Sequence, residues 1–232
     1  MSERLEFYSR SPFEIHHILT DFESLTEHSA YADLHLPESE GPFGCVVAVH
    51  EDHLRNWLES GMAVCQLHPF STRSVESVVE DQLSVTHAMV LADAFAVKKV
   101  LDSDARIGSI GIAGWSLGGT VATYSAWSPI IEALGTPFDA HLPFYPATHL
   151  RPDVKQWSDA PMLILHGTGD DWTPISLVEG LLPDMPNAIL HAYPGAYHAF
   201  DSTEDKKWLP KAIRLGKRTV RIEENGHMSG VW

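Results

Sequence analysis

The chain has 232 residues, of which 44% are hydrophobic, so it can bury one sizeable core, and a single domain is the expected organisation. It carries 31 acidic against 16 basic residues. The resulting net charge of -15 argues against nucleic-acid and membrane surfaces, which need clustered Lys and Arg. We therefore expect a small-molecule partner, no nucleic acid, no membrane, and a monomer or homodimer.

The opening residues MSERLEFYSRSPFEIHH are charged and contain no apolar segment of signal-peptide length. No later run approaches the roughly 20 apolar residues that span a bilayer, so we expect a cytoplasmic protein. Cys45 and Cys65 each lie in an apolar, strand-like run, which predicts buried, reduced thiols rather than a disulfide.

We divide the single domain into an N-terminal extension (1–29), a core (30–201) and a C-terminal segment (202–232). Short, almost continuously apolar runs are typical of central strands in a parallel sheet with helices on both faces, which predicts an α/β fold. The predicted strands are residues 45–50, 62–67, 107–114, 139–145, 162–167 and 188–193. Residues 37–44, PESEGPFG, are expected to form a surface turn.

Helical spacing of apolar residues over 74–102 predicts a long crossover helix, unbroken or broken once. Thr173 is expected to cap a further helix whose first residue is Pro174. Near the C-terminus, residues 206–218 offer a short helix candidate, and 219–232 show no helical period. Either a closing helix is missing there, or the tail packs irregularly, with a second subunit as one possible support.

The stretch GIAGWSLGGTVA places Ser116 between a strand-like run and a helix-like run. Gly114 and Gly118 would let two backbone segments approach there without a Cβ clash. Such a turn lifts the Ser116 hydroxyl clear of the sheet and directs the N–H of Leu117 toward an oxyanion formed beside it. A structural turn with a helix-capping serine is the alternative.

A serine hydroxyl needs an imidazole base, which in turn needs a carboxylate to orient it. HGTGDDWTP (166–174) follows one predicted strand and supplies Asp170 and Asp171, and PGAYHAFD (194–201) follows the next strand and supplies His198. Because the carboxyl ends of parallel strands lie at one edge of a sheet, these loops are expected to converge with Ser116.

GIAGWSLGG, HGTGDDWTP and YPGAYHAFD together resemble the α/β-hydrolase superfamily and, within it, the dienelactone hydrolase family. The resemblance covers roughly residues 30 to 201 and implies an α/β-hydrolase fold. It also implies Ser116 as nucleophile, His198 as base and Asp170, four residues before Pro174, as acid, with Asp171 in reserve. Dienelactone hydrolases proper have a cysteine nucleophile, so Ser116 favours a general serine esterase here.

The second oxyanion donor is expected after the first core strand, where the sequence reads VHEDHLRNWLESG. Glutamate follows His50 in place of the glycine that hydrolases of this kind usually have. The N–H of Glu51 or Asp52 takes the donor position, and Asp52 aligns better with the family pattern. The acidic side chains of Glu51 and Asp52 would disfavour anionic substrates.

Three other residues are candidates for substrate binding, each with an alternative. Arg73 either binds a substrate carboxylate, as arginines do in dienelactone hydrolases, or pairs with a surface acid. Trp115 and Trp172 flank the nucleophile and the acid, and either wall an acyl pocket or belong to the core.

No metal and no cofactor is expected, because the 14 histidines show no ligand spacing such as HExxH. His166 is expected to have a structural role, and His141 lies in a strand-like run. The sequence therefore predicts a serine hydrolase that cleaves a small carboxylic ester, lactone or thioester through an acyl-enzyme on Ser116. The alternatives are a catalytically silent fold that binds a ligand or partner, and a small peptidase of prolyl-oligopeptidase type.

Overall fold

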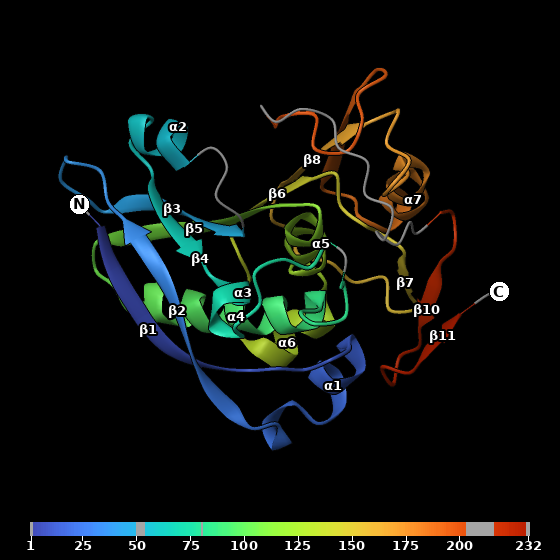
Figure 1. The fold of residues 1–232 in the computed structure, drawn as a ribbon, viewed down its shortest axis with the longest axis horizontal. Coiled ribbons are helices and arrows are strands. Elements are labelled where there is room, and N and C mark those ends of the chain that lie inside the picture. The colour runs from blue at the N-terminus through green and yellow to red at the C-terminus, as the bar shows by residue number, and fades with distance from the viewer. Residues whose placement is uncertain (1, 50–53, 80, 203–215, 231–232) are drawn as a thin grey trace.

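A computed structural model describes residues 2–49, 54–79, 81–202 and 216–230. An eight-stranded sheet forms its centre, in the order β1-β2-β4-β3-β5-β6-β8-β9. Six neighbouring strands of this sheet are mutually parallel, namely β4, β3, β5, β6, β8 and β9. At one edge, β1 is antiparallel to β2 and β2 is antiparallel to β4 (Figure 1). The strands of this sheet are β1 (Ser2–Arg10), β2 (Glu27–His35), β3 (Phe43–Val49), β4 (Ala63–Leu67), β5 (Ile107–Trp115), β6 (Ala140–Phe144), β8 (Met162–Gly167) and β9 (Ala188–Tyr193).

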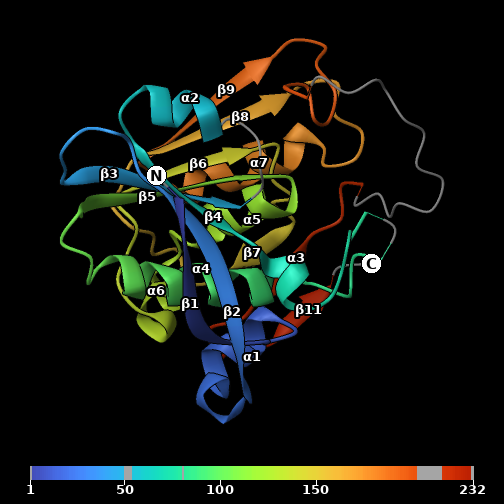
Figure 2. The same cartoon turned by 60° about the vertical axis from the view of Figure 1, so that its left-hand side comes forward.

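Helices cover both faces of the sheet, with α2 on one side and α4 and α6 on the other (Figure 2). The helix α5 packs on β5 and β6 and also contacts α4. The helices are α1 (Ile15–Thr20), α2 (Leu54–Glu59), α3 (Pro69–Thr72), α4 (His87–Leu101), α5 (Leu117–Tyr124), α6 (Ser128–Leu134) and α7 (Ile175–Leu181), with 3-10 turns at Phe22–Ser24 and Leu182–Asp184. None of the helices in the described ranges is long and apolar enough to cross a membrane.

All six predicted strands are present, with ends that differ by at most two residues over the described positions. The strands at the centre of the sheet are apolar because both faces are covered there, whereas the edge strand β9 has no buried residue and Ile189 on it is 68% exposed. On the central strands, Val47 and Ile112, for example, are at most 1% exposed. Cys45 and Cys65 lie in this core as buried free thiols, as predicted. Burial raises the pKa of Cys45 to about 12.

The segment that the sequence analysis treated as an N-terminal extension, residues 1–29, contributes β1 and the start of β2 to the main sheet. The side chains of β1 alternate between exposed and more buried positions, as expected for an edge strand with one face in water. Phe7 and Ala30, which face each other across the pair, both lie in the main core.

The predicted crossover helix over 74–102 is wrong in its first half, because α4 begins only at His87. Thr86 caps it by accepting a hydrogen bond from the N–H of Met89 at 3.4 Å. The described residues between 74 and 86 contain no helix, and Leu83, which fitted the helical spacing, is 64% exposed. Serine and β-branched valine, which favour helices weakly, dominate that stretch.

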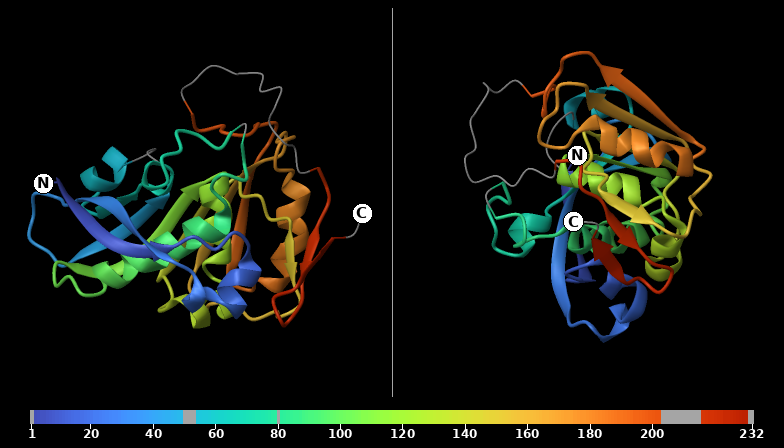
Figure 3. Two further views of the ribbon diagram at one scale, coloured as in Figure 1. Left: turned by 60° about the horizontal axis from the view of Figure 1, so that its bottom comes forward. Right: turned by 90° about the vertical axis from the view of Figure 1, so that its right-hand side faces the viewer.

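Of the two alternatives for the C-terminal tail, irregular packing is wrong, because the tail contributes two strands. Strands β10 (Val220–Ile222) and β11 (Met228–Gly230) form an antiparallel pair, and β10 lies parallel to β7 (Leu150–Pro152). This three-stranded sheet lies at the opposite end of the molecule from β1 (Figure 3). It is held to the same chain by the buried side chains of Ile222 and Leu150. The helix candidate at 206–218 falls largely outside the described residues.

One buried histidine predicts how stability depends on pH. His141, on β6, is 2% exposed, and its Nδ1 lies 3.1 Å from the carbonyl oxygen of Ala122 and 3.1 Å from the Ser125 hydroxyl. Its Nε2 is buried without a partner in the described structure, and burial lowers the pKa of His141 from 6.5 to about 4. Between these values the unfolded chain is protonated and the folded chain is not, so protons favour unfolding.

We expect the free energy of unfolding to fall between pH 6.5 and pH 4, with about 3 kcal/mol of the loss due to His141. His141→Asn keeps a side-chain donor near Ala122 but does not titrate, so its unfolding free energy should change less with pH. Urea unfolding of both proteins across this range measures the difference. Parallel curves for the two proteins would contradict the prediction.

Candidate active site

The strand-to-helix turn at Ser116 has an unusual backbone. Ser116 joins the end of β5 to the start of α5 with φ 54° and ψ -110°, in a region that L-residues seldom occupy. Its N–H donates to the carbonyl of Phe144 at 3.0 Å, and its own carbonyl accepts the N–H of Thr120 at 2.9 Å. The backbone is therefore held on both sides of the serine.

Glycine is required on both sides of the turn because the backbone approaches itself closely. A Cβ on Gly114 would lie 2.2 Å from the carbonyl oxygen of Gly118, and one on Gly118 would lie 2.4 Å from that of Val49. The two glycines therefore have the role that the sequence predicted for them.

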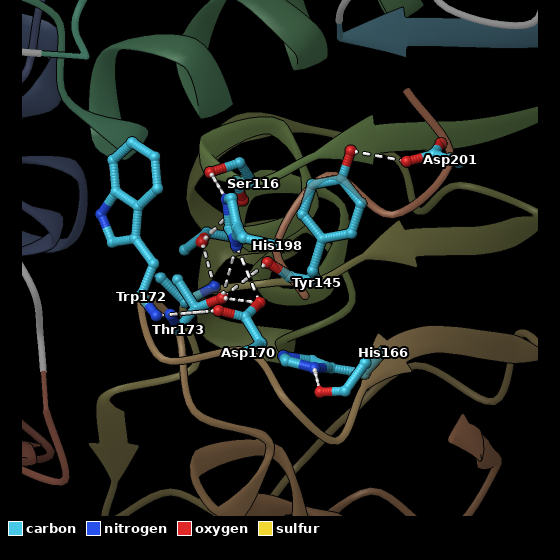
Figure 4. A network of polar contacts seen from close by, with 11 residues as sticks. Ser116, Tyr145, His166, Asp170, Trp172, Thr173, His198 and Asp201 are labelled. Atoms are coloured by element: carbon cyan, nitrogen blue, oxygen red, sulfur yellow. Dashed lines mark hydrogen bonds and ion pairs between the residues drawn. The ribbon is translucent and has the colours of Figure 1, made fainter. Parts of the chain in front are cut away.

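The structure brings the predicted nucleophile, base and acid together in one line (Figure 4). The Nε2 atom of His198 lies 2.9 Å from the Oγ of Ser116, and its Nδ1 lies 2.8 Å from the Oδ2 of Asp170. Ser116 follows β5, Asp170 follows β8 and His198 follows β9, so all three lie at the carboxyl ends of parallel strands.

Asp170 is 5% exposed and is surrounded by donors. Its Oδ1 accepts the backbone N–H groups of Trp172 and Thr173, each at 2.9 Å, and its Oδ2 accepts the Thr173 hydroxyl at 2.9 Å. Burial raises the pKa of Asp170, but the hydrogen bond and charge of His198 and the hydrogen bonds from Thr173 outweigh burial, so the pKa lies below its usual value. Asp170 rather than the exposed Asp171 thus contacts the base as an anion.

Thr173 is not the helix cap that the sequence predicted, because α7 begins at Ile175 with Pro174 in the cap position. Its buried hydroxyl lies 2.9 Å from Asp170 Oδ2, 3.1 Å from His198 Nδ1 and 3.2 Å from the carbonyl oxygen of Tyr145. The short polar side chain that suggested a cap instead supports the acid and the base.

Arg73 does not have the position expected of a substrate ligand. Its side chain is 9% exposed and forms a two-pronged ion pair with Asp93 on α4, at 2.6 and 3.0 Å. It also donates to the Ser11 hydroxyl and the Pro69 carbonyl. With its donors engaged by protein atoms, Arg73 joins the loop after β4 to the core.

Trp115 belongs to the core rather than to an acyl pocket. Its ring is 3% exposed and stacks on Phe144 with centroids 4.8 Å apart, and its Nε1 donates to Asp201 at 2.8 Å. Trp172 is partly exposed, and its ring lies 4.9 Å from the His198 ring, so it remains a candidate wall of the site.

The predicted oxyanion donors are only partly described. Leu117 is the first residue of α5, and the first N–H groups of a helix have no partner within it. The residues expected to supply the second donor, Glu51 and Asp52, lie outside the described residues, as does His50.

His166 is completely buried, with Nδ1 3.1 Å from the carbonyl oxygen of Gly167, and burial lowers its pKa. It lies below Asp170, away from Ser116 (Figure 4), as expected of a structural residue. Across the described residues no three His, Cys, Asp or Glu side chains are grouped to hold a metal ion.

Sequence reasoning missed two residues beside the triad, Tyr145 and Asp201. The Tyr145 ring lies 4.6 Å from the His198 ring, and its hydroxyl donates to Asp201 at 2.9 Å. Asp201 stands three residues after His198, and that proximity was the available signal. Its donors lie at the end of β5 and directly after β6, so they could not be identified from the sequence.

The sheet order and the turn at Ser116 define an α/β-hydrolase fold, and comparisons with known proteins agree. The dienelactone hydrolase family matches residues 62–220, more than half of the chain. The chain therefore belongs to the dienelactone hydrolase family. No curated protein sequence matches it.

Three solved structures illustrate the shared fold. Est1E from Butyrivibrio proteoclasticus is 16% identical, with a TM-score of 0.55, over 75% of this chain and 88% of that one. A Klebsiella pneumoniae protein assigned to the dienelactone hydrolases is 20% identical, with a TM-score of 0.56, over 86% and 89%. Esterase 2 of Thermogutta terrifontis, phosphorylated by paraoxon, is 17% identical, with a TM-score of 0.55, over 73% and 79%.

The Arg73–Asp93 pair predicts an effect on stability rather than on substrate binding. We expect Asp93→Ala to lower the free energy of unfolding by about 3 to 5 kcal/mol, because it leaves the Arg73 charge buried and unpaired. The double variant Arg73→Met, Asp93→Leu should regain most of the loss. Urea unfolding measures both. A selective rise in KM for carboxylate-bearing esters in Arg73→Met, with stability intact, would instead assign Arg73 to the substrate.

Thr173 offers a matched pair of variants at the acid. Thr173→Val keeps the shape but removes one hydrogen bond to Asp170, whose typical worth predicts a fall in kcat/KM of roughly 10-fold. Thr173→Ser keeps the hydroxyl and should stay within about 3-fold of wild type. Ester hydrolysis rates of the two variants decide the matter, and equal rates would show that the hydroxyl has no role.

Proposed function

We propose that this protein is a serine esterase that cleaves a small carboxylic ester, lactone or thioester through an acyl-enzyme on Ser116. The observation that carries the proposal is the continuous line from Ser116 Oγ through both nitrogens of His198 to a buried, anionic Asp170. Membership of a hydrolase family and the description of the Thermogutta protein as an esterase support it by analogy.

In the first step, His198 Nε2 takes the proton of Ser116 as Oγ attacks the carbonyl carbon of the substrate. The bond from Oγ to carbon forms, the carbonyl electrons move to oxygen, and Asp170 stabilises the imidazolium through Nδ1. The N–H of Leu117 and a second donor, assigned to the backbone of Asp52, would hold the oxyanion.

In the second half, His198 returns its proton to the departing alcohol or thiol, and the bond from carbon to the leaving group breaks. Water then attacks the acyl carbon while His198 accepts one of its protons, the bond from that carbon to Oγ breaks as His198 gives this proton to Oγ, and the acid product leaves. The proton lost from Ser116 to the leaving group is replaced by one from water, so the proposed cycle balances without a cofactor.

The test mixes the protein with a short p-nitrophenyl acyl ester and, separately, with a fluorophosphonate probe. We expect turnover and a covalent mass gain on the peptide that contains Ser116. Ser116→Ala should lose labelling and at least about 10⁴-fold in turnover. Ser103→Ala, which changes an exposed serine at the end of α4, is the matched control and should behave as wild type.

Folded wild-type protein that neither turns over the ester nor labels would contradict the proposal and favour a silent, ligand-binding fold. A peptide p-nitroanilide tests the peptidase alternative in the same assay. Cleavage of that amide faster than of the ester would assign the site to peptide substrates.

A further inference from the structure

The base of the triad lies on a loop without regular structure. Residues 194–202, here called the base loop, follow β9 and include Ala199 with φ 56°, a conformation unusual for alanine. Before His198 the base loop is tied to the loop that carries the acid, because the N–H of Gly195 donates to the Thr168 hydroxyl and the carbonyl of Ala196 accepts the N–H of Gly169. The position of His198 also depends on what holds the loop after it.

After His198, the carboxylate of Asp201 accepts two hydrogen bonds from residues at the ends of β5 and β6. The Tyr145 hydroxyl donates to Oδ1 at 2.9 Å (Figure 4), and the Trp115 indole N–H donates to Oδ2 at 2.8 Å. Both donor residues are 3% exposed and lie in one buried cluster with Phe144 and Ala113. Two charge-assisted bonds to rigid core groups form an anchor for the second half of the base loop.

Each donor is itself tied to the triad. Trp115 is joined to Ser116 by a peptide bond. Tyr145 lies with its ring against His198, and its carbonyl oxygen lies 3.2 Å from the Thr173 hydroxyl oxygen. The contacts therefore close a ring that runs through Ser116, His198, Asp170, Thr173, Tyr145, Asp201 and Trp115.

We propose that Asp201 is a positioning residue that holds His198 Nε2 within hydrogen-bond reach of Ser116 by fixing the base loop to Trp115 and Tyr145. This inference rests on the proposed function of Ser116 and His198. A displacement of about 1 Å at a reacting group can cost on the order of 100-fold in rate, so an anchor three residues away is sufficient to control turnover.

The chemistry of the two donors supplies a matched pair of variants. An indole N–H can only donate, whereas a tyrosine hydroxyl can donate or accept. Asp201→Asn can therefore accept from Trp115 through its oxygen and donate to Tyr145 through its amide, which preserves both contacts. Asp201→Leu has a similar size and preserves neither.

We expect Asp201→Leu to lower kcat for the p-nitrophenyl ester and the rate of fluorophosphonate labelling by roughly 10- to 100-fold, with KM changed less than about 3-fold. Asp201→Asn should stay within about 5-fold of wild type. Tyr145→Phe removes one of the two bonds and should lower labelling roughly 3- to 10-fold. When Tyr145→Phe is combined with Asp201→Leu, it should lower the labelling rate little further, because both substitutions break the same hydrogen bond.

Val97→Ala creates a cavity at the buried face of α4 and therefore controls for lost stability. Below the unfolding temperature of this variant, Ser116 should be labelled at the wild-type rate. Folded Asp201→Leu that labels as fast as wild type would overturn the inference, as would a loss matched by Val97→Ala at equal destabilisation. If Asp201→Leu does not fold, Tyr145→Phe decides, and an unchanged labelling rate overturns it. Wild type that does not label overturns the proposed function itself, whereas active wild type with unaffected variants overturns the anchor alone.

Discussion

The backbone turn at Ser116 is the constraint on which the rest of the site depends. A non-glycine residue with φ 54° and ψ -110° is expected to cost about 1 to 3 kcal/mol and persists only where its surroundings enforce it. Here the turn is enforced by the hydrogen bond from Ser116 to Phe144 and by the contact of Gly114 with the Gly118 carbonyl. These contacts link β5, α5 and β6, so the hydroxyl is fixed by the centre of the sheet.

Around this fixed point the site has an electrostatic order that follows from burial. Asp170 remains anionic in a buried position because its oxygens receive hydrogen bonds from the Thr173 hydroxyl, from two backbone N–H groups and from His198. A buried carboxylate with fewer partners would take up a proton and lose its influence on the imidazole. His198 together with the residues between Asp170 and Pro174 therefore keeps the acid anionic.

Most of the strands that the sequence predicted are largely buried. Strands β3, β4 and β6 and the second half of β5 are apolar because helices cover both faces of the sheet there, whereas β9 is an apolar edge strand in which Ile189 is 68% exposed. Strands β1 and β2 were missed because one face meets water, and their alternating polar residues are no more apolar than a loop. The start of α4 was misjudged because Val75 and Val78, which pack against the core from a non-helical segment, share helical spacing with Leu83, which is exposed.

In the candidate site, too, some residues could be predicted from the sequence and others could not. Ser116, Asp170 and His198 were identified because strand ends and local motifs mark them, and the structure places them in contact. The partners of Arg73 and Asp201 lie in distant parts of the chain, so no local pattern could show that one is paired with Asp93 and the other with Tyr145 and Trp115. Contacts between side chains that are far apart in the sequence could be identified only from the folded structure.

These distant contacts matter more because this chain has serine in place of the cysteine of dienelactone hydrolases proper. A thiol is a few per cent thiolate near neutral pH and strongly nucleophilic, whereas a hydroxyl is a weak nucleophile until a base removes its proton. In the proposed mechanism, proton removal requires His198 to hold one geometry toward Ser116 on one side and Asp170 on the other. Because His198 lies on an irregular loop, that geometry must be supplied by bonds to the rigid sheet, and the carboxylate of Asp201 supplies two of them.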